Sequence, residues 1–302
     1  MTVQEITTDS LLSEWGAASG TREIVLKGIR RLLRDPLSVF GIAILGVVVL
    51  TAVFGPSLTR YEPVGMFASE RFLPPSAQYW VGTDHLGRDV FTRIVYGARI
   101  SLLIAISVSS LSAIIGLIMG GIAGFFGGWV DEALMRVTDI FQSFPWLIFA
   151  MAVALVIGPN LVNGMLSLSF IWWPGYARLV RGQVLATKSK EFVQAAHALG
   201  ATNLRIFLRH VLPNSMGPYI VLLTIGAGRV ILATSTLSFI GLGAQPPTPE
   251  WGVMVSDGRT LLFDAWWMAT FPGLAILITA VGFNLLGDGL RDLLDPKAKV
   301  KG

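Results

Sequence analysis

The chain has no cysteine and little charge. Of its 302 residues, 14% are charged, whereas a soluble domain of this length carries about a quarter. The absence of cysteine excludes disulfide bonds and thiolate metal sites. The charges that are present cluster in a few windows, which are separated by long uncharged runs. This distribution, with 53% hydrophobic residues, is typical of a protein that crosses a membrane several times.

Several enzyme motifs are also missing. The phosphate-binding pattern G-x-x-x-x-G-K-[S/T] does not occur, so we expect no nucleotide hydrolysis by this chain. The patterns G-x-S-x-G and H-E-x-x-H are absent, and the histidines are His85, His197 and His210. A serine hydrolase and a zinc protease are therefore disfavoured. We expect a protein that is not an enzyme and holds no cofactor or metal.

The uncharged segments predict an all-α bundle of six transmembrane helices within residues 36–290. The first covers residues 36–59, and the second lies within 100–130. Residues 140–177 are too long for one span and are divided at Gly158-Pro159-Asn160, which gives the third and fourth. The fifth and sixth cover about residues 218–242 and 267–286. Pro145 and Pro174 are expected to kink the third and fourth.

Lysine and arginine concentrate in three windows, at 22–34, 178–209 and 291–301. With six spans these windows share one side, which the positive-inside rule makes the cytoplasm. The expected cytoplasmic parts are a tail at 1–35, a loop at 178–214 and a tail at 291–302; the expected external loops are 60–99 and 243–266. The first external loop holds five arginines, which weakens the contrast. Because the cations flank apolar spans, the net charge of +4 does not indicate a nucleic-acid partner.

The N-terminal segment shows no short apolar core followed by a cleavage site, so we expect a retained anchor. Residues 22–34 alternate basic and apolar side chains and predict an amphipathic helix on the membrane surface. It either contacts lipid specifically or is an ordinary flank of the first span.

Four glycines recur every four residues in the second predicted span: Gly116, Gly120, Gly124 and Gly128. Helices in lipid associate through close packing, so a glycine stripe predicts a tight helix–helix contact. Flexibility of a moving helix is the other interpretation.

The polar loop after the fourth span reads as two short helices around a glycine turn. Glu191 begins the first helix, where an acid suits the helix dipole. Ala195 and Ala196 leave a face that another protein can approach closely. Gly200 is suited to the left-handed position after a helix. Asn203 is expected to cap the second helix and Pro213 to end it.

The first external loop is followed by apolar residues at helical spacing. Val90, Ile94 and Ala98 predict an amphipathic helix on the membrane surface that leads into the second span. Asp89 and Arg93 are four residues apart and could form an ion pair. This segment either seals the mouth of the bundle or belongs to a platform for an external protein; Asp84, Arg88, Asp89 and Arg93 are the candidate contacts.

The fifth span contains one arginine and several hydroxyl groups. A charge at mid-bilayer depth is costly, so Arg229 should face a partner subunit or a wet pathway. Thr234, Ser235 and Ser238 either line such a pathway or bond back to their own helix.

Four separated segments, at 82–99, 191–213, 241–252 and 283–292, together resemble the dipeptide/oligopeptide/nickel branch of ABC importer permeases, in particular its C-type subunit. The resemblance covers nearly the whole chain after residue 30 and implies the type I importer architecture in the bacterial inner membrane. It also implies a homologous B-type permease, two ATP-binding subunits and an external solute-binding protein as partners.

The same resemblance implies that the loop after the fourth span transmits force from the ATPase. The residues carried over to this role are Glu191, Ala195, Ala196, Gly200, Ile206 and Pro213. His197 stands where the family often has arginine or lysine, and no acid stands near Thr234, where the branch often has one. Di- and oligopeptides are the expected substrates. Nickel chelates, opines and other solutes stay open, as does a different class, a six-span scaffold without transport.

Overall fold

The computed structural model describes residue 30 and residues 32–294. The described part is helical throughout, apart from one isolated bridge between Thr83 and Asp89. The predicted basic helix at 22–34 lies outside the described residues except for its last few positions. Residues 295–302 of the predicted C-terminal tail also lie outside them.

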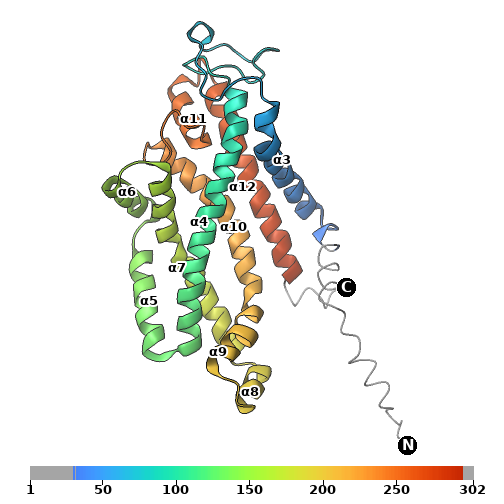
Figure 1. The fold of residues 1–302 in the computed structure, drawn as a ribbon, viewed down its shortest axis with the longest axis vertical. Coiled ribbons are helices and arrows are strands. Elements are labelled where there is room, and N and C mark those ends of the chain that lie inside the picture. Colours follow the sequence, from blue (N-terminus) through green and yellow to red (C-terminus); the bar gives the residue numbers. More distant parts are fainter. Residues whose placement is uncertain (1–29, 31, 295–302) are drawn as a thin grey trace, which may run out of the picture.

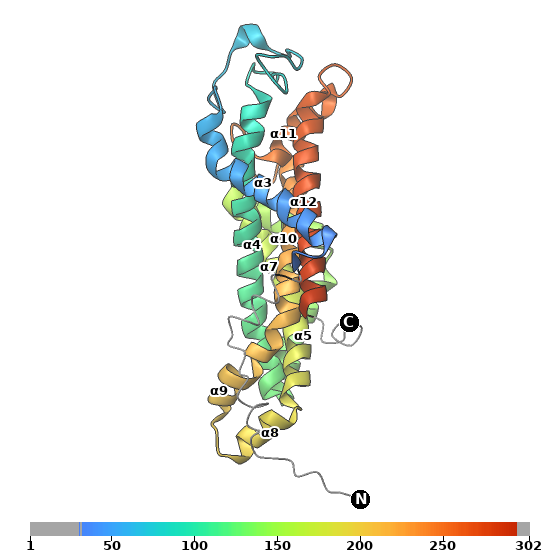
Figure 2. The same ribbon diagram turned by 90° about the vertical axis from the view of Figure 1, so that its right-hand side faces the viewer.

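Helix α3 (Pro36–Leu58) is the first apolar helix. Asp35 caps it by accepting a hydrogen bond from the Ser38 amide at 2.7 Å, and a proline at the first position needs no amide partner. Figure 2 shows α3 crossing α12 and α4 diagonally.

Helices α4 (Val90–Phe126) and α7 (Leu161–Lys188) form the closest pair in the bundle. The predicted glycine contact is confirmed at three positions. A methyl group on Gly116 or Gly120 would lie 2.7–2.8 Å from backbone atoms of α7, and one on Gly124 would lie 2.9 Å from the Arg181 carbonyl oxygen. The prediction is wrong for Gly128, which already belongs to the next helix. The chain turns at Gly127–Gly128, where both residues have positive φ.

The third predicted span is bent in the structure. Helix α5 (Gly128–Ser143) starts twelve residues earlier than expected and carries charged side chains, and α6 (Trp146–Ile157) follows at an angle of 88° to it. Figure 1 shows α5 beside α7, and α6 turned away from the direction of α5. Pro145 lies at the break, where it cannot continue the helix. The predicted division at 158–160 is confirmed: Gly158 has φ +102° and Asn160 caps α7.

The chain from residue 216 to residue 294 contains α10 (Met216–Phe239), the short α11 (Trp251–Gly258) and α12 (Trp267–Leu294). Helices α10 and α12 pack against each other, and α11 covers them at the end that also carries residues 59–89. Two more short helices, α8 (Glu191–Ala198) and α9 (Asn203–Ile206), lie at the opposite end.

Within the described residues, four helices are long and apolar enough to cross a membrane, and a fifth span results if the bent α5–α6 pair is counted as one. Helix α7 is not among them, although its 28 residues extend about 42 Å, more than the roughly 30 Å of a bilayer core. The all-helical membrane bundle is thus confirmed, and the count of six stays a prediction.

Helix boundaries also differ from those expected for the loops. Helix α7 runs to Lys188, so the polar loop begins later than residue 178. Helix α4 begins at Val90, so the predicted surface helix of the 60–99 loop is wrong: its residues are the first turns of α4, and Val90 and Ala98 are buried. Helix α12 continues four residues beyond 290.

Candidate functional site

The loop between α7 and α10 folds as the sequence predicts around Gly200. This glycine has φ +80°. Its amide donates to the His197 carbonyl at 2.9 Å, and the Ala201 amide donates to the Ala196 carbonyl at 3.1 Å. This pair of bonds is the Schellman motif, which satisfies the last carbonyls of a helix and reverses the chain. Helix α8 therefore ends in a sharp, defined turn.

Two details of the second helix differ from the prediction. Thr202, not Asn203, is the cap: it has extended backbone angles and its hydroxyl accepts from the Arg205 amide at 3.4 Å, whereas Asn203 is already helical. Pro213 does not end the helix. The chain stays helical through a π-turn at Phe207–Val211, and Pro213 opens the 3₁₀ turn that leads into α10, because a first-turn proline has no amide to satisfy.

The inner face of the loop packs on the ends of α4 and α7. Val193, Ile206 and Val211 are buried in one apolar cluster with Phe125 and Val184. The predicted contact residue Ile206 is thus an anchor and does not face a partner. Ala196, which is half-buried, packs against the same cluster.

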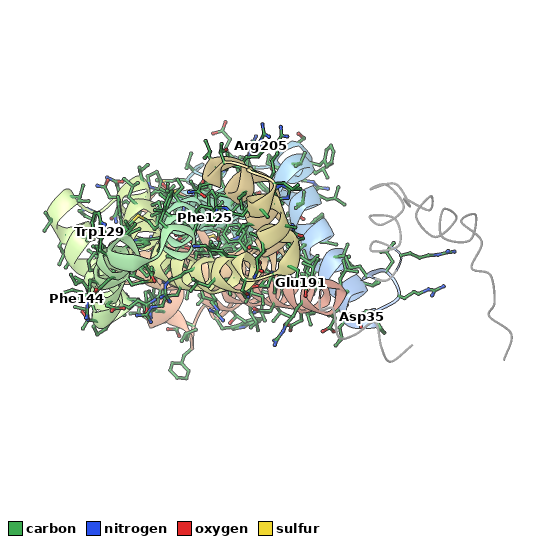
Figure 3. All side chains as sticks on the ribbon, turned by 90° about the horizontal axis from the view of Figure 1, so that it is seen from below. Asp35, Phe125, Trp129, Phe144, Glu191 and Arg205 are labelled. Carbon is green, nitrogen blue, oxygen red and sulfur yellow. The ribbon has the colours of Figure 1, made fainter. Side chains whose placement is uncertain are left out.

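The outer face of the loop is exposed. It carries the predicted residues Glu191, Ala195 and Gly200. It also carries apolar side chains that the sequence reasoning missed: Phe192, Leu199, Leu204 and Leu208, of which Leu199 is 87% and Leu204 67% exposed. Figure 3 looks onto this end of the molecule and labels Glu191 and Arg205 on the loop. The sequence does carry a signal for this apolar surface: Leu199, Leu204 and Leu208 are apolar residues in a loop that also contains many polar ones.

Lys188 fastens the start of the loop to α4. Its ammonium group donates to the Phe125 carbonyl at 2.5 Å and lies 5.3 Å from the centre of the Phe125 ring. The same ring lies 5.0 Å from that of Phe207. Ser215, at the end of the loop, donates to the Thr187 hydroxyl at 3.2 Å. Both ends of the loop are therefore tied to the helices beside it.

Two ion pairs join α5 to α7. Arg181 holds Asp131 through two hydrogen bonds of 2.5 and 2.7 Å, and Arg178 donates to Asp139 at 2.6 Å. Two acids of α5 are thus paired with two arginines of α7.

The four candidate docking residues at the other end are all buried, with Arg88 and Arg93 only 1% exposed. Arg88 donates to Asp84 at 2.6 Å, and Arg93 lies 3.8 Å from Asp84. The predicted Asp89–Arg93 ion pair is wrong, because the Asp89 carboxylate caps α4 by accepting from the Thr92 amide at 2.8 Å. These side chains hold the loop on the bundle and are not available to an external protein in the single subunit.

Helix α11 completes this end through long-range contacts. The indole of Trp251 donates to the Ile94 carbonyl and that of Trp267 to the Thr83 carbonyl, both at 3.0 Å. Glu250 caps α11 by accepting from the Val253 amide at 3.0 Å, and its burial raises the pKa of its carboxyl group. Arg88 reaches Asp257 on α11 at 3.7 Å. The segments 59–89 and 243–266 are thereby joined to each other.

Arg229 lies halfway along α10 and is exposed. It lines a groove of about 500 Å³ formed by α5, α6, α7 and α10. The hydroxyls predicted with it behave differently. Thr234 donates back to the Val230 carbonyl at 2.8 Å, Ser238 accepts from the Ala244 amide at 3.1 Å, and Ser235 is buried. Thr236, another hydroxyl of the same run, lines the groove instead.

The sequence matches known families and proteins. Residues 112–300 match the family described as binding-protein-dependent transport system inner membrane component, and residues 27–75 match the N-terminal transmembrane domain of oligopeptide transport permease C. A probable D,D-dipeptide transport system permease from Escherichia coli is 45% identical over 87% of this chain and 89% of its own. A dipeptide transport system permease from Alkalihalophilus pseudofirmus is 42% identical over 95% and 93%, respectively.

Solved structures support the fold. The MetNI methionine ABC transporter in an inward-facing conformation aligns with a TM-score of 0.55 and 19% identity, over 67% of this chain and 96% of the matched one. An amino acid ABC transporter aligns at 0.52 and 12% identity, over 66% and 92%. Together with the sequence matches, these show that the chain belongs to the binding-protein-dependent inner membrane components of ABC importers, in the branch that resembles oligopeptide permease C.

Proposed function

We propose that this chain is one of two permease subunits of an ABC importer that carries di- and oligopeptides across the bacterial inner membrane. A homologous B-type subunit would complete the pathway, two ATP-binding subunits would drive it, and an external protein would deliver the peptide. Both chain termini would face the cytoplasm. The observation that carries the proposal is the α8–α9 loop, which is fastened to the bundle on one face and exposes apolar side chains on the other.

The exposed face has the chemistry of a docking surface. Leu199 and Leu204 offer apolar area that is costly to leave in water, and Glu191 adds a negative charge at the start of α8. Ala195 beside them allows a neighbouring backbone to come close. An ATPase with an apolar cleft and a cation at its rim would complement this face.

Force applied to the face would pass into two helices. Helix α8 follows α7 after two residues, and Lys188 ties that junction to α4. Helix α9 continues through the π-turn into α10 without an extended linker. Movement of the loop would therefore displace α7 and α10 together, and these helices line the groove at Arg229.

At the other end, the exposed side chains of the first loop would meet the external protein. Trp80 and Phe72 are exposed there, whereas Asp84, Arg88, Asp89 and Arg93 support the loop from inside. We therefore assign the docking function to the exposed side chains of the first loop and no longer to the four buried residues.

The names of the relatives favour peptides as the substrates of this chain, because several are dipeptide permeases. Another relative, 40% identical, is a glutathione transport system permease. The binding protein encoded with this chain would decide among such solutes. A six-span scaffold without transport is the alternative from another class.

The test is ATP-driven uptake of a labelled dipeptide into vesicles that contain the whole complex. Glu191→Arg should reduce uptake at least tenfold while membrane insertion stays normal. The matched control is Glu132→Arg, which reverses a charge on the exposed face of α5 and should leave uptake within twofold of wild type. Uptake that is unchanged by Glu191→Arg would refute the coupling role of the loop, and absence of any uptake by the wild-type complex would favour the scaffold.

A further inference from the structure

Arg229 is a charge in the middle of a long apolar helix. Helix α10 places it about 20 Å from its first residue and about 15 Å from its last. At that depth an arginine exposed to lipid is strongly unfavourable, by roughly 2.5 kcal/mol or more. Within residues 30 and 32–294, no carboxylate pairs with its guanidinium group and no carbonyl accepts from it. None of the described residues therefore supplies its counter-charge.

The space in front of Arg229 is a groove and not a flat contact surface. Its volume of about 500 Å³ lies in the range of small-molecule sites, about 300–1,000 Å³. Gln142 adds an amide group that can donate and accept hydrogen bonds, and Trp146 and Trp172 add aromatic faces. The Thr236 hydroxyl donates to the Leu232 carbonyl at 2.8 Å, and its oxygen can accept from a ligand. The two tryptophan rings lie 6.4 Å apart.

We propose that Arg229 binds the carboxylate of the peptide as it passes through this groove. The inference rests on the proposed function. Every peptide with a free C-terminus carries one carboxylate, whatever its sequence, and the planar guanidinium group binds a carboxylate through two parallel hydrogen bonds. The amide of Gln142 and the hydroxyl of Thr236 suit peptide backbone groups. The indoles of Trp146 and Trp172 suit side chains of varied shape, because aromatic faces offer contact area without a fixed pattern of hydrogen bonds.

This arrangement explains how one site could accept many peptides. The only charge in the groove acts on the group that all substrates share, while the variable side chains meet apolar surface. The open geometry also suits a transient site, because a carboxylate that is held by one arginine and few further contacts can leave again. An acid of the B-type subunit in the same position is the competing occupant, and the experiment separates the two.

The experiment compares a dipeptide with its C-terminal amide. Vesicles with the whole complex receive each peptide at a concentration that saturates the binding protein, so that the preference of that protein does not enter the ratio of uptake rates. We expect wild type to transport the acid faster than the amide. Arg229→Gln should lower this acid-to-amide ratio at least fivefold, and Arg229→Lys, which keeps the charge, should lower it less.

Arg136→Gln is the matched control, because it removes an exposed positive charge that does not line the groove; its ratio should equal that of wild type. If Arg229→Gln slows both peptides equally, the arginine serves the assembly of the two permeases and the carboxylate site is refuted. If the wild-type complex transports neither peptide, the proposed function fails as well, which distinguishes the two failures.

Discussion

The ammonium group of Lys188 lies 2.5 Å from the carbonyl oxygen of Phe125 and faces the ring of the same residue. One side chain at the end of α7 thus satisfies an orphan carbonyl at the end of α4. The contact joins the two helices of the closest pair in the bundle at the point where the α8–α9 loop begins.

Lys188→Met should weaken the connection between the loop and α4. The substitution keeps the apolar stem and removes both the hydrogen bond and the cation–π contact, each worth about 1 kcal/mol. We expect ATP hydrolysis by the reconstituted complex to continue while peptide uptake per ATP falls severalfold. Lys190→Met, at an exposed position whose side chain makes no capping bond, is the control. Equal uptake per ATP in both variants would contradict the role of the Lys188–Phe125 contact.

Gly200→Ala should disturb the turn after α8. Gly200 has φ +80°, and the left-handed conformation costs an alanine about 1–2 kcal/mol. The expected result is reduced uptake with normal membrane insertion. The comparison is Gly182→Ala in α7, where a methyl group meets nothing within 4 Å and alanine favours the helix. An uptake rate of Gly200→Ala that matches that of Gly182→Ala would show that the turn does not need glycine.

Gly120→Ala should destabilise the α4–α7 pair. A methyl group there would overlap the carbonyl oxygen of Ala177 and lie 2.8–2.9 Å from the carbonyl carbon and Cα of the same residue, and overpacking of this kind costs about 1–3 kcal/mol. Thermal unfolding in detergent should show a lower Tm. Gly46→Ala in α3, where the methyl group points into open space, should leave the Tm unchanged; a similar loss in both variants would exclude close packing as the cause.

Glu250→Gln should make the stability of the folded protein less sensitive to a rise in pH. Burial raises the pKa of the Glu250 carboxyl in the folded state above its ordinary value of 4.5, so the folded protein binds more protons than the unfolded chain. Stability from this group is therefore complete below about pH 4.5 and declines as pH rises through the higher folded pKa. The amide oxygen of glutamine can still accept from the Val253 amide.

The check is the difference in Tm between wild type and Glu250→Gln, measured from pH 4 to pH 8. We expect wild type to lose stability relative to the variant as pH rises. A difference that is constant, or that moves in the opposite direction, would show that the carboxyl group is not destabilised by burial.

Much of the fold could be predicted from local patterns. Uncharged runs such as 36–59 can exist in lipid only as helices, because every backbone polar group must be satisfied within the segment. The glycine stripe predicted the contact of α4 with another helix, although its partner α7 could not be named. Gly200 predicted the turn after α8, since the requirement for positive φ is local.

For the site residues too, local features could be predicted from the sequence and features that depend on distant elements could not. The sequence marked the α8–α9 loop and Arg229, because a polar loop and a charge within a long apolar segment stand out against apolar surroundings. It could not decide that Ile206 faces inward while Leu199 and Leu204 face outward, since that depends on where α4 and α7 end.

The sequence by itself determined that the chain is an apolar helical bundle with one structured polar loop, because hydropathy and backbone preference act over short distances. Tertiary structure decided which charges meet. Asp84 and not Asp89 lies beside Arg93, and α5 carries its acids toward arginines of α7 some 40–50 residues away. These ion pairs and the groove in front of Arg229 depend on elements brought together from distant parts of the chain.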